Sequence, residues 1–326
     1  MSQTAHKLPA GALLASPAPA APRPRKRRRL PADRLPFLLP GLLLLAILIY
    51  IPMLLAGYMS FTQLNQYTIA NWLHAPLDQF GNYVTALSPH SPIGSSFLGS
   101  IKTSALFAVF STVIAAPIGV GAGLLMNSRV HGRRVLRVIV LVPYVIPSFV
   151  TGIVWRLMFE NGWGLVDRTL RAVHLSNGST YWLIGGHSLW ALVIADAWAS
   201  WPFIYMMTLA GLQQISPEVR EAAIMDGAGA VRRLRYVILP LLWPTLSLAL
   251  LFSALNHLNN FALPYVMFGN YPPAAAAVMP VTIYNQSFGL FNFGLGAAMS
   301  ILSLLVMLLP AVVYMRATKL GEEAAA

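Results

Sequence analysis

The chain is organised around one polar stretch, Glu221-Ala222-Ala223-Ile224-Met225-Asp226-Gly227-Ala228, with Leu239-Pro240 shortly after it. Ser216-Pro217-Glu218 precedes it and predicts a helix start, because a hydroxyl residue, a proline and then an acid suit the first positions of a helix. Gly227 and Gly229 predict that this helix ends near Asp226. Residues 230–238 can form a second short helix before Pro240 opens the next apolar segment. The stretch is therefore predicted to be a structured polar connection.

The rest of the chain is strongly apolar. Of its 326 residues, 57% are hydrophobic and only 10% are charged. A bilayer core of about 30 Å requires about 20 mostly apolar residues per helix, so we predict an all-α integral membrane protein with six transmembrane helices. The predicted spans cover about residues 36–60, 99–127, 137–159, 188–212, 239–262 and 293–315. The transmembrane domain thus extends over 35–316, and the polar stretch lies between its fourth and fifth spans.

The distribution of positive charge predicts the orientation of the spans. Most of the 22 lysines and arginines lie in the amino-terminal segment, in the loops after the second and fourth spans, and at the carboxy-terminal end. Because cytoplasmic loops are enriched in basic residues, both termini and the polar stretch are predicted to be cytoplasmic. Residues 1–34 are predicted to form a disordered basic tail, and residues 317–326 a second tail. The run Pro24–Arg29 would also suit nuclear targeting or RNA binding, but the membrane anchor that follows disfavours a nucleic-acid partner.

The sequence lacks the patterns of common enzyme classes. It contains no cysteine, which excludes disulfides, thiolate metal sites and cysteine nucleophiles. It contains no Gly-x-x-x-x-Gly-Lys-Ser/Thr phosphate loop, so ATP binding in the usual way is excluded. Ser-His-Asp, metal-ligand and dinucleotide-binding patterns are absent as well. The chain is predicted to be no enzyme and to hold no cofactor or metal of its own.

Asp196 is the one acid in the middle of a predicted span. It lies about eight residues into the fourth span, which places it about 12 Å below the outer boundary at 1.5 Å per residue. Acids inside the membrane are costly and usually mark functional sites. Ser200 lies on the same face of the helix, one turn further in.

The fifth span carries Asn256, His257 and Asn260 at a similar depth, and the two asparagines share a face. Amides and a carboxylate suit the hydroxyl groups of a sugar, and Trp201 or a neighbouring tryptophan could supply an aromatic face for stacking. The alternative is that these side chains hydrogen-bond one another and hold the helices together. The substrate interpretation is favoured for the asparagines and the structural one for His257, and both stay open for Asp196.

The polar stretch resembles the EAA loop of permease subunits in binding-protein-dependent ABC importers. The pattern of that family is Glu-Ala-Ala, three residues, Gly, nine further residues, a β-branched aliphatic residue, any residue, and Leu-Pro. This chain matches it at Glu221-Ala222-Ala223, Gly227, Val237 and Leu239-Pro240, and it also has the common Asp226-Gly227-Ala228.

The resemblance covers about residues 35–316. Its further points are Asn82-Tyr83 in the first outer loop, Pro143 and Pro147 in the third span, Ala210-Gly211-Leu212 before the polar stretch, and Tyr284-Asn285-Gln286-Ser287-Phe288 before the last span. The combination is most similar to the first permease of carbohydrate systems, the maltose and glycerol-phosphate type. Phe268–Pro273 differs from the Thr-Gly-Gly-Gly-Pro turn that the family often has after its fifth span.

This resemblance implies a function and a set of partners. The segment 216–240 would couple the chain to two cytoplasmic ABC ATPase subunits, which would bind ATP and Mg. The residues implied in coupling are Glu221, Ala222, Ala223, Asp226, Gly227, Leu239 and Pro240. A second permease and an extracytoplasmic solute-binding protein would complete the importer, in the lipid of a prokaryotic plasma membrane.

The resemblance also implies a small-molecule cargo, a di- or oligosaccharide. In the sugar-type permeases, the residues that resemble Asp196, Ser200, Asn256, His257 and Asn260 lie on helices that line the substrate cavity. A non-sugar solute such as glycerol phosphate is an alternative. An ion-coupled secondary transporter with Asp196 as its relay is a further alternative, but such a protein would need internal repeats, and no clear repeat is present.

Overall fold

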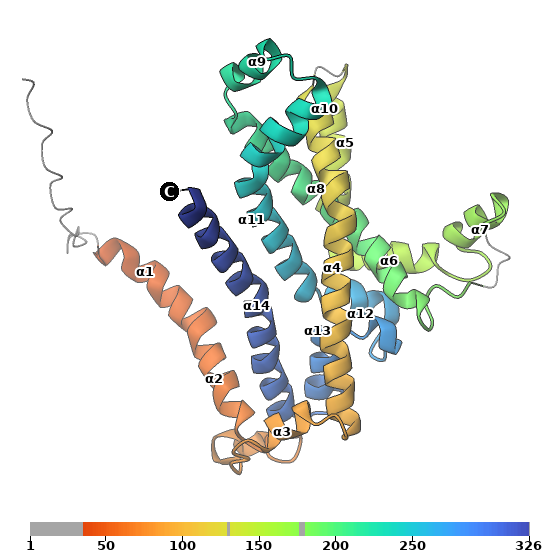
Figure 1. The fold of residues 1–326 in the computed structure, drawn as a ribbon. Coiled ribbons are helices and arrows are strands. Elements are labelled where there is room, and N and C mark those ends of the chain that lie inside the picture. The colour runs from red at the N-terminus through yellow and green to blue at the C-terminus, as the bar shows by residue number, and fades with distance from the viewer. Residues whose placement is uncertain (1–34, 129–130, 176–179, 326) are drawn as a thin grey trace, which may run out of the picture. The chain divides into compact units, whose positions relative to one another are not determined.

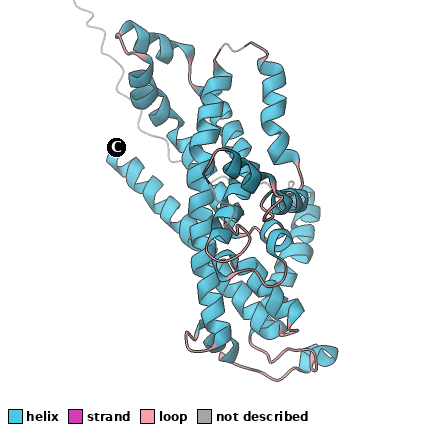
Figure 2. Cartoon of the chain, turned by 90° about the vertical axis from the view of Figure 1, so that its right-hand side faces the viewer, coloured by secondary structure: helices cyan, strands magenta, loops and turns pink. Residues whose placement is uncertain are grey.

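The computed structural model describes residues 35–128, 131–175 and 180–325. The predicted basic tail over residues 1–34 lies outside this part of the chain. The described residues are helical, with one isolated antiparallel bridge between Thr62 and Leu77 and no strand (Figure 2). Within them, residues 35–51 and residues 52–325 belong to two different units.

The first described helices form an apolar stretch. Helix α1 covers Leu35–Leu45, a π-helical turn covers Ala46–Tyr50, and α2 covers Ile51–Ser60. Together, Leu39–Ser60 is 22 residues long and apolar enough to cross a membrane. This agrees with the first predicted span.

Three long helices, α4 (Pro92–Asn127), α8 (His187–Gln214) and α11 (Leu239–Leu258), pack against one another in the larger unit (Figure 1). Glycines allow α4 and α8 to approach closely. A Cβ atom added at Gly119 would lie 2.7 Å from the Ile204 Cβ, and one added at Gly123 would lie 2.6 Å from the Thr208 Cγ2. Small residues are typical of such contacts, because helices within a membrane associate by close packing rather than by burial from water.

Short elements connect the long helices at their ends. They are η3 (Ile69–His74), α3 (Gly81–Leu87), α7 (Leu165–Ala172), α12 (Ala262–Phe268), η5 (Ala274–Ala276), α13 (Met279–Tyr284) and η6 (Asn285–Gly289). Helix α3 lies at the end of the larger unit opposite to α9 (Pro217–Met225) (Figure 1). The last helix, α14, covers Phe293–Ala325 and so extends beyond residue 315, where the last span was predicted to end.

Polar side chains satisfy the backbone of these connections. The Met279 N–H at the start of α13 donates to the Ser104 Oγ at 2.8 Å, and the Asn82 amide donates to the carbonyls of Ser60 and Thr62 at 3.1 and 2.9 Å. The Tyr83 hydroxyl lies 2.7 Å from the Ser60 Oγ. Irregular backbone within or near a membrane requires such partners, which gives the Asn82-Tyr83 pair a structural role.

The third predicted span, 137–159, is not a single helix in the structure. The structure has α5 (Arg133–Val145) and α6 (Ser148–Met158), which are bent by 88° at the break between them. Ile146 is extended, with ψ 127°, because the residue before a proline is driven out of the helical region, and Pro147 also lacks an N–H. The described residues therefore hold five helices that could cross a membrane, or six if this pair counts as one span.

The boundaries of two further spans also differ from the prediction. Helix α4 starts at Pro92 rather than near residue 99. The expected separate helix over 230–238 instead joins the fifth span, since Ala230–Leu258 is one helical stretch of 29 residues. It contains α10 (Ala230–Arg233) and a π-helical turn, Leu234–Ile238, and it ends at Leu258 instead of residue 262.

Candidate functional site

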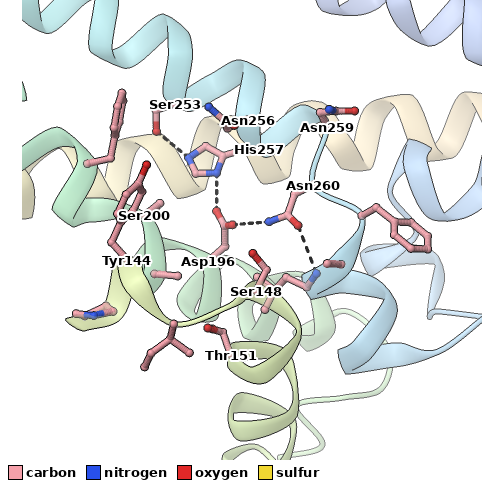
Figure 3. A pocket seen from close by; sticks show the side chains of 17 residues that line it. Tyr144, Ser148, Thr151, Asp196, Ser200, Ser253, Asn256, His257, Asn259 and Asn260 are labelled. Atoms are coloured by element: carbon pink, nitrogen blue, oxygen red, sulfur yellow. Dashed lines mark hydrogen bonds and ion pairs between the residues drawn. The ribbon is translucent and has the colours of Figure 1, made fainter. Parts of the chain in front are cut away.

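The break between α5 and α6 lines a partly open cavity of about 410 Å³. This volume falls in the range of small-molecule sites, roughly 300–1,000 Å³. Its walls come from the α5–α6 break, the middle of α8, the end of α11 and the start of α12 (Figure 3). The lining residues are Pro143, Tyr144, Ile146, Ser148, Thr151, Asp196, Ala199, Ser200, Phe203, Ser253, Asn256, His257, Asn259, Asn260, Phe261, Ala262 and Leu263.

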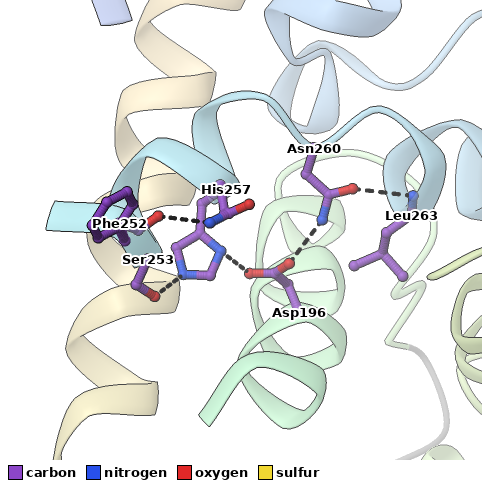
Figure 4. Close-up of polar contacts among 7 residues, drawn as sticks. Asp196, Phe252, Ser253, His257, Asn260 and Leu263 are labelled. Carbon is purple, nitrogen blue, oxygen red and sulfur yellow. Dashed lines mark hydrogen bonds and ion pairs between the residues drawn. The ribbon is translucent and has the colours of Figure 1, made fainter. Parts of the chain in front are cut away.

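A buried polar network crosses one side of this cavity (Figure 4). The Asp196 Oδ2 lies 2.6 Å from the His257 Nδ1, and the Asn260 amide donates to the Asp196 Oδ1 at 2.9 Å. The His257 Nε2 is 3.0 Å from the Ser253 Oγ. The Asn260 Oδ1 in turn accepts from the Leu263 N–H at 3.3 Å. The network thus joins α8, the end of α11 and the start of α12.

These contacts bear directly on the residues that the sequence singled out. Asp196, His257 and Asn260 come together as their common depth predicts, and the first two are only 4% and 3% exposed. They bond one another, which is what the structural alternative describes, and they also line the cavity. Asn256 lines the cavity too, while its amide donates to the Phe252 carbonyl at 2.9 Å.

Two hydroxyl groups of the cavity wall lie outside this network. The Thr151 Oγ and the Ser200 Oγ are buried and have no hydrogen-bond partner within the described part of the chain. Buried polar groups in proteins are normally hydrogen-bonded. A solute that carries hydroxyl groups could satisfy both, which makes this cavity the candidate binding site.

The aromatic wall differs from the predicted one. Trp201 does not line the cavity and instead packs against the cluster of Ala115, Ala197 and Ile204. The rings of Tyr144 and Phe203 line the cavity and stack at 6.3 Å between centroids. The reason is helical geometry: residues three or four apart share a face, so Phe203 follows Ser200 on the cavity side, whereas the residue directly after Ser200 is rotated by about 100°.

Sequence reasoning also missed Ser148 and Thr151, which the α5–α6 break brings to the cavity. Their signal was Pro143 and Pro147, since prolines within an apolar span mark possible breaks. The size of the bend, and hence which hydroxyls face the cavity, could not be derived from those prolines.

The polar stretch forms a well-defined helix, α9. Its first turn is as predicted, with Ser216 at the N-cap, Pro217 in the first turn and Glu218 as an early acid. The pKa of Glu218 is lowered, first by its hydrogen bond with its own backbone N–H and second by one with the Ser216 hydroxyl.

The carboxyl end of α9 is closed by Gly227, which has φ +75°. The Gly227 N–H donates to the Ile224 carbonyl and the Ala228 N–H donates to the Ala223 carbonyl, each at 3.0 Å. These two bonds around a left-handed glycine form a Schellman motif. The predicted end near Asp226 is thereby confirmed, since Asp226 is the C-cap.

The predicted coupling residues do not form one surface. Glu221, Ala222 and Asp226 are exposed on α9, whereas Ala223 is buried. Leu239 packs instead with the core cluster of Leu212, Ile238, Leu242 and Leu246.

Beside α9 lies a groove of about 240 Å³ lined by Pro217, Arg220, Glu221, Ile224 and Arg233. Apolar side chains are exposed on the same segment: Ile224 is 54% exposed and Met225 is 87% exposed.

The chain is similar in sequence to permease proteins of known transport systems. The trehalose/maltose transport system permease protein MalF of Thermococcus litoralis is 34% identical over 236 residues, which cover 72% of this chain and 77% of that protein. The sn-glycerol-3-phosphate transport system permease protein UgpA of Rhizobium meliloti is 28% identical over 233 residues, which cover 70% of this chain and 76% of that protein.

Solved structures give the same fold. A chain of a bacterial ABC transporter involved in the import of the acidic polysaccharide alginate matches with a TM-score of 0.71 at 20% identity, over 86% of this chain and 94% of that chain. Residues 115–319 match the family described as the binding-protein-dependent transport system inner membrane component. The protein therefore belongs to this family, and it is a multi-pass inner-membrane permease of the ABC importers.

Proposed function

We propose that this permease imports a carbohydrate, a di- or oligosaccharide, that an extracytoplasmic binding protein delivers to it. The observation that carries this proposal is the cavity at the α5–α6 break. Its buried hydroxyls on Thr151 and Ser200 lack partners in the described chain, and aromatic rings of Tyr144, Phe203 and Phe261 share its wall. Hydroxyls and amides match the hydroxyl groups of a sugar, and aromatic faces match its apolar ring faces.

The network of Asp196, His257 and Asn260 would position the site. Because these side chains already bond one another, their role is to hold α8, α11 and α12 at fixed distances around the solute. Asn256 and Ser200 would contact the solute directly. Trp201, which lies in the packed cluster with α4, would not.

Helix α9 would couple the cavity to ATP hydrolysis. With both termini in the cytoplasm, as the basic residues predict, α9 faces the cytoplasm, where two ATPase subunits would bind ATP and Mg and dock on α9. Its Schellman motif fixes where the helix ends. Glu221, Ile224 and Met225 are exposed on it and available to a partner. A second permease would supply the other half of the pathway, and ligand binding would set the populations of inward- and outward-facing states.

Reconstitution with the partner subunits and the binding protein tests the cavity. In proteoliposomes, ATP-driven uptake of radiolabelled trehalose is the measurement. Thr151→Val keeps the shape of the side chain and removes its hydroxyl, and a hydrogen bond contributes about 0.5–1.5 kcal/mol, so uptake should fall about twofold to tenfold. Thr169→Val is the matched control, because that hydroxyl is exposed on α7 and bonds only the Leu165 carbonyl among the described residues. Equal uptake by both variants would remove Thr151 from the site.

Two further variants test the remaining parts of the proposal. Glu221→Lys should abolish ATP-driven uptake while the chain stays in the membrane, and normal uptake would refute docking on α9. Asn256→Ala, which leaves the network of Asp196, His257 and Asn260 in place, should impair transport without loss of assembly. The ion-coupled alternative makes a separate prediction: uptake that needs no ATPase partner and collapses when a protonophore is added.

A further inference from the structure

Two arginines begin helix α5 without a negative partner. Arg133 and Arg134 are exposed, and neither forms an ion pair within the described part of the chain. The first turn of α5 contains no acid. Figure 1 shows this start of α5 at the same end of the larger unit as α9, which the distribution of basic residues predicts to be cytoplasmic. The start of α5 therefore carries two positive charges that no carboxylate of the described chain balances.

The next arginine of the helix, Arg137, is occupied by another helix. Its Nη2 donates to the Met126 carbonyl at 3.4 Å, in the last turn of α4. A cation suits this position, because the carboxyl end of a helix leaves carbonyls without partners. Tyr144 follows Arg137 by two helical turns and lines the cavity. Arg137 and Tyr144 thus mark the inward side of α5, and Arg133 and Arg134 remain free.

The opposite side of α5 is apolar and uncovered. Starting at Arg134, intervals of four, four and three residues lead along one line of the helix through three valines, and two further branched side chains flank this line. We call these five side chains the outward face. They are Val135, Val138, Ile139, Val142 and Val145, and they are 65, 67, 57, 48 and 75% exposed.

The length of the outward face matches one leaflet of a bilayer. From Arg134 to Val145 the helix rises by about 16 Å, at 1.5 Å per residue, which is about half of a hydrocarbon core of about 30 Å. Helix α5 ends at Val145, and α6 leaves at an angle of 88° to it. The arginines are thereby placed at the headgroups and the last valine near the middle of the bilayer. A charged head above apolar tails is the chemistry of a phospholipid.

The composition of α5 favours lipid over a further helix as the occupant of the outward face. Close contacts between helices of this chain use glycine: a Cβ atom added at Gly119, Gly152 or Gly211 would lie 2.7, 2.9 or 2.8 Å from a side-chain atom of the facing helix. Helix α5 contains no glycine, alanine, serine or threonine. Helices within a membrane associate through such small residues, whereas fluid acyl chains can fill the spaces between branched side chains.

We infer that the start and the outward face of α5 bind one anionic phospholipid, with its phosphate on Arg133 and Arg134 and its acyl chains along the valines. Guanidinium groups match phosphate oxygens because each can donate two parallel hydrogen bonds. Basic residues next to a membrane helix attract anionic lipids electrostatically. The site is separate from the cavity wall, so it does not depend on the identity of the cargo.

A crosslinker on the outward face identifies its occupant. Val138 is replaced by p-benzoylphenylalanine in the full importer, which is placed in nanodiscs of equal parts phosphatidylglycerol and phosphatidylcholine. Ultraviolet light then joins position 138 to its neighbour, and mass spectrometry identifies the adduct. We expect phospholipid adducts in which phosphatidylglycerol exceeds phosphatidylcholine about thirtyfold, as for two basic residues at an anionic surface. A crosslink to a second permease, no lipid adduct, or a ratio near one overturns the inference.

Charge variants separate this site from general attraction of anionic lipid. Arg133→Gln with Arg134→Gln should bring the ratio of the two adducts close to one. Arg232→Gln with Arg235→Gln is the matched control, because it removes the same charge from exposed arginines at the same end of the larger unit, and it should leave the ratio unchanged. An equal fall in both double variants overturns the inference. So does loss of the preference on addition of inorganic phosphate at constant ionic strength, which would show a site for a free anion.

Discussion

The close approach of α4 and α8 gives the sharpest stability prediction. A Cβ atom at Gly119 would lie 2.7 Å from the Ile204 Cβ, 2.7 Å from the Trp201 carbonyl oxygen and 2.9 Å from the Tyr205 nitrogen. Two of these three atoms belong to the backbone of α8, which cannot rotate away as a side chain would. Gly119→Ala must therefore separate the two helices or distort one of them.

Gly121 provides a matched control on the same helix. No atom lies within 4 Å of a Cβ atom added there, so Gly121→Ala introduces no contact. Both substitutions gain the same intrinsic helix propensity, about 1 kcal/mol in favour of alanine. The difference between the two variants therefore isolates the packing term.

The magnitude follows from the two effects. Overpacking of a close contact costs about 1–3 kcal/mol, so Gly119→Ala should be less stable than Gly121→Ala by about that amount. Gly121→Ala should be at least as stable as the natural chain. The free energy of unfolding can be compared by denaturant titration of the purified protein in detergent micelles, followed through tryptophan fluorescence.

The outcome that refutes this reasoning is equal stability of the two alanine variants. Equal stability would mean that α4 and α8 are further apart than described, or that α8 shifts freely. Because several cavity residues lie on α8, the Gly119→Ala variant should also lower transport, whereas Gly121→Ala should not.

Three further predictions concern the network and α9. Asp196→Ala and His257→Ala should each destabilise the protein by about 3–5 kcal/mol, because each leaves a buried partner unpaired. In a thermodynamic cycle, the double variant should lose less stability than the sum of the two single variants. Additive losses would show that the two side chains do not interact. Gly227→Ala should cost about 1–2 kcal/mol, because its φ is +75° although its Cβ would meet no atom. Gly99→Ala, inside α4 and also without an atom near its Cβ, should cost nothing in the same denaturation assay. The lowered pKa of Glu218 means that its carboxylate stabilises α9 above the usual glutamate pKa of 4.5, and that this stabilisation is lost as the pH falls through the lower pKa of the folded protein. An NMR titration of its side chain that gives a pKa of 4.5 or more contradicts this.

Local signals in the sequence predicted a large part of the fold. The apolar runs placed the long helices, because the length of a spanning helix is set by the thickness of the bilayer. The start and end of α9 followed from Ser216, Pro217 and Gly227, because capping depends on residues next to one another in the chain. Helical periodicity and depth likewise predicted that Asp196 and Asn260 face the same region.

What the sequence by itself determined is thus the set of helices, their ends at polar caps, and the residues that belong to one depth of the membrane. The tertiary structure alone decided the 88° bend at Pro147, the exposure of Thr151 and Tyr144 to the cavity, and the removal of Trp201 from it. It also decided that Asp196 pairs with His257. The physical reason is that these outcomes depend on how each helix is rotated and bent against its neighbours, and many close contacts such as that at Gly119 set this rotation together.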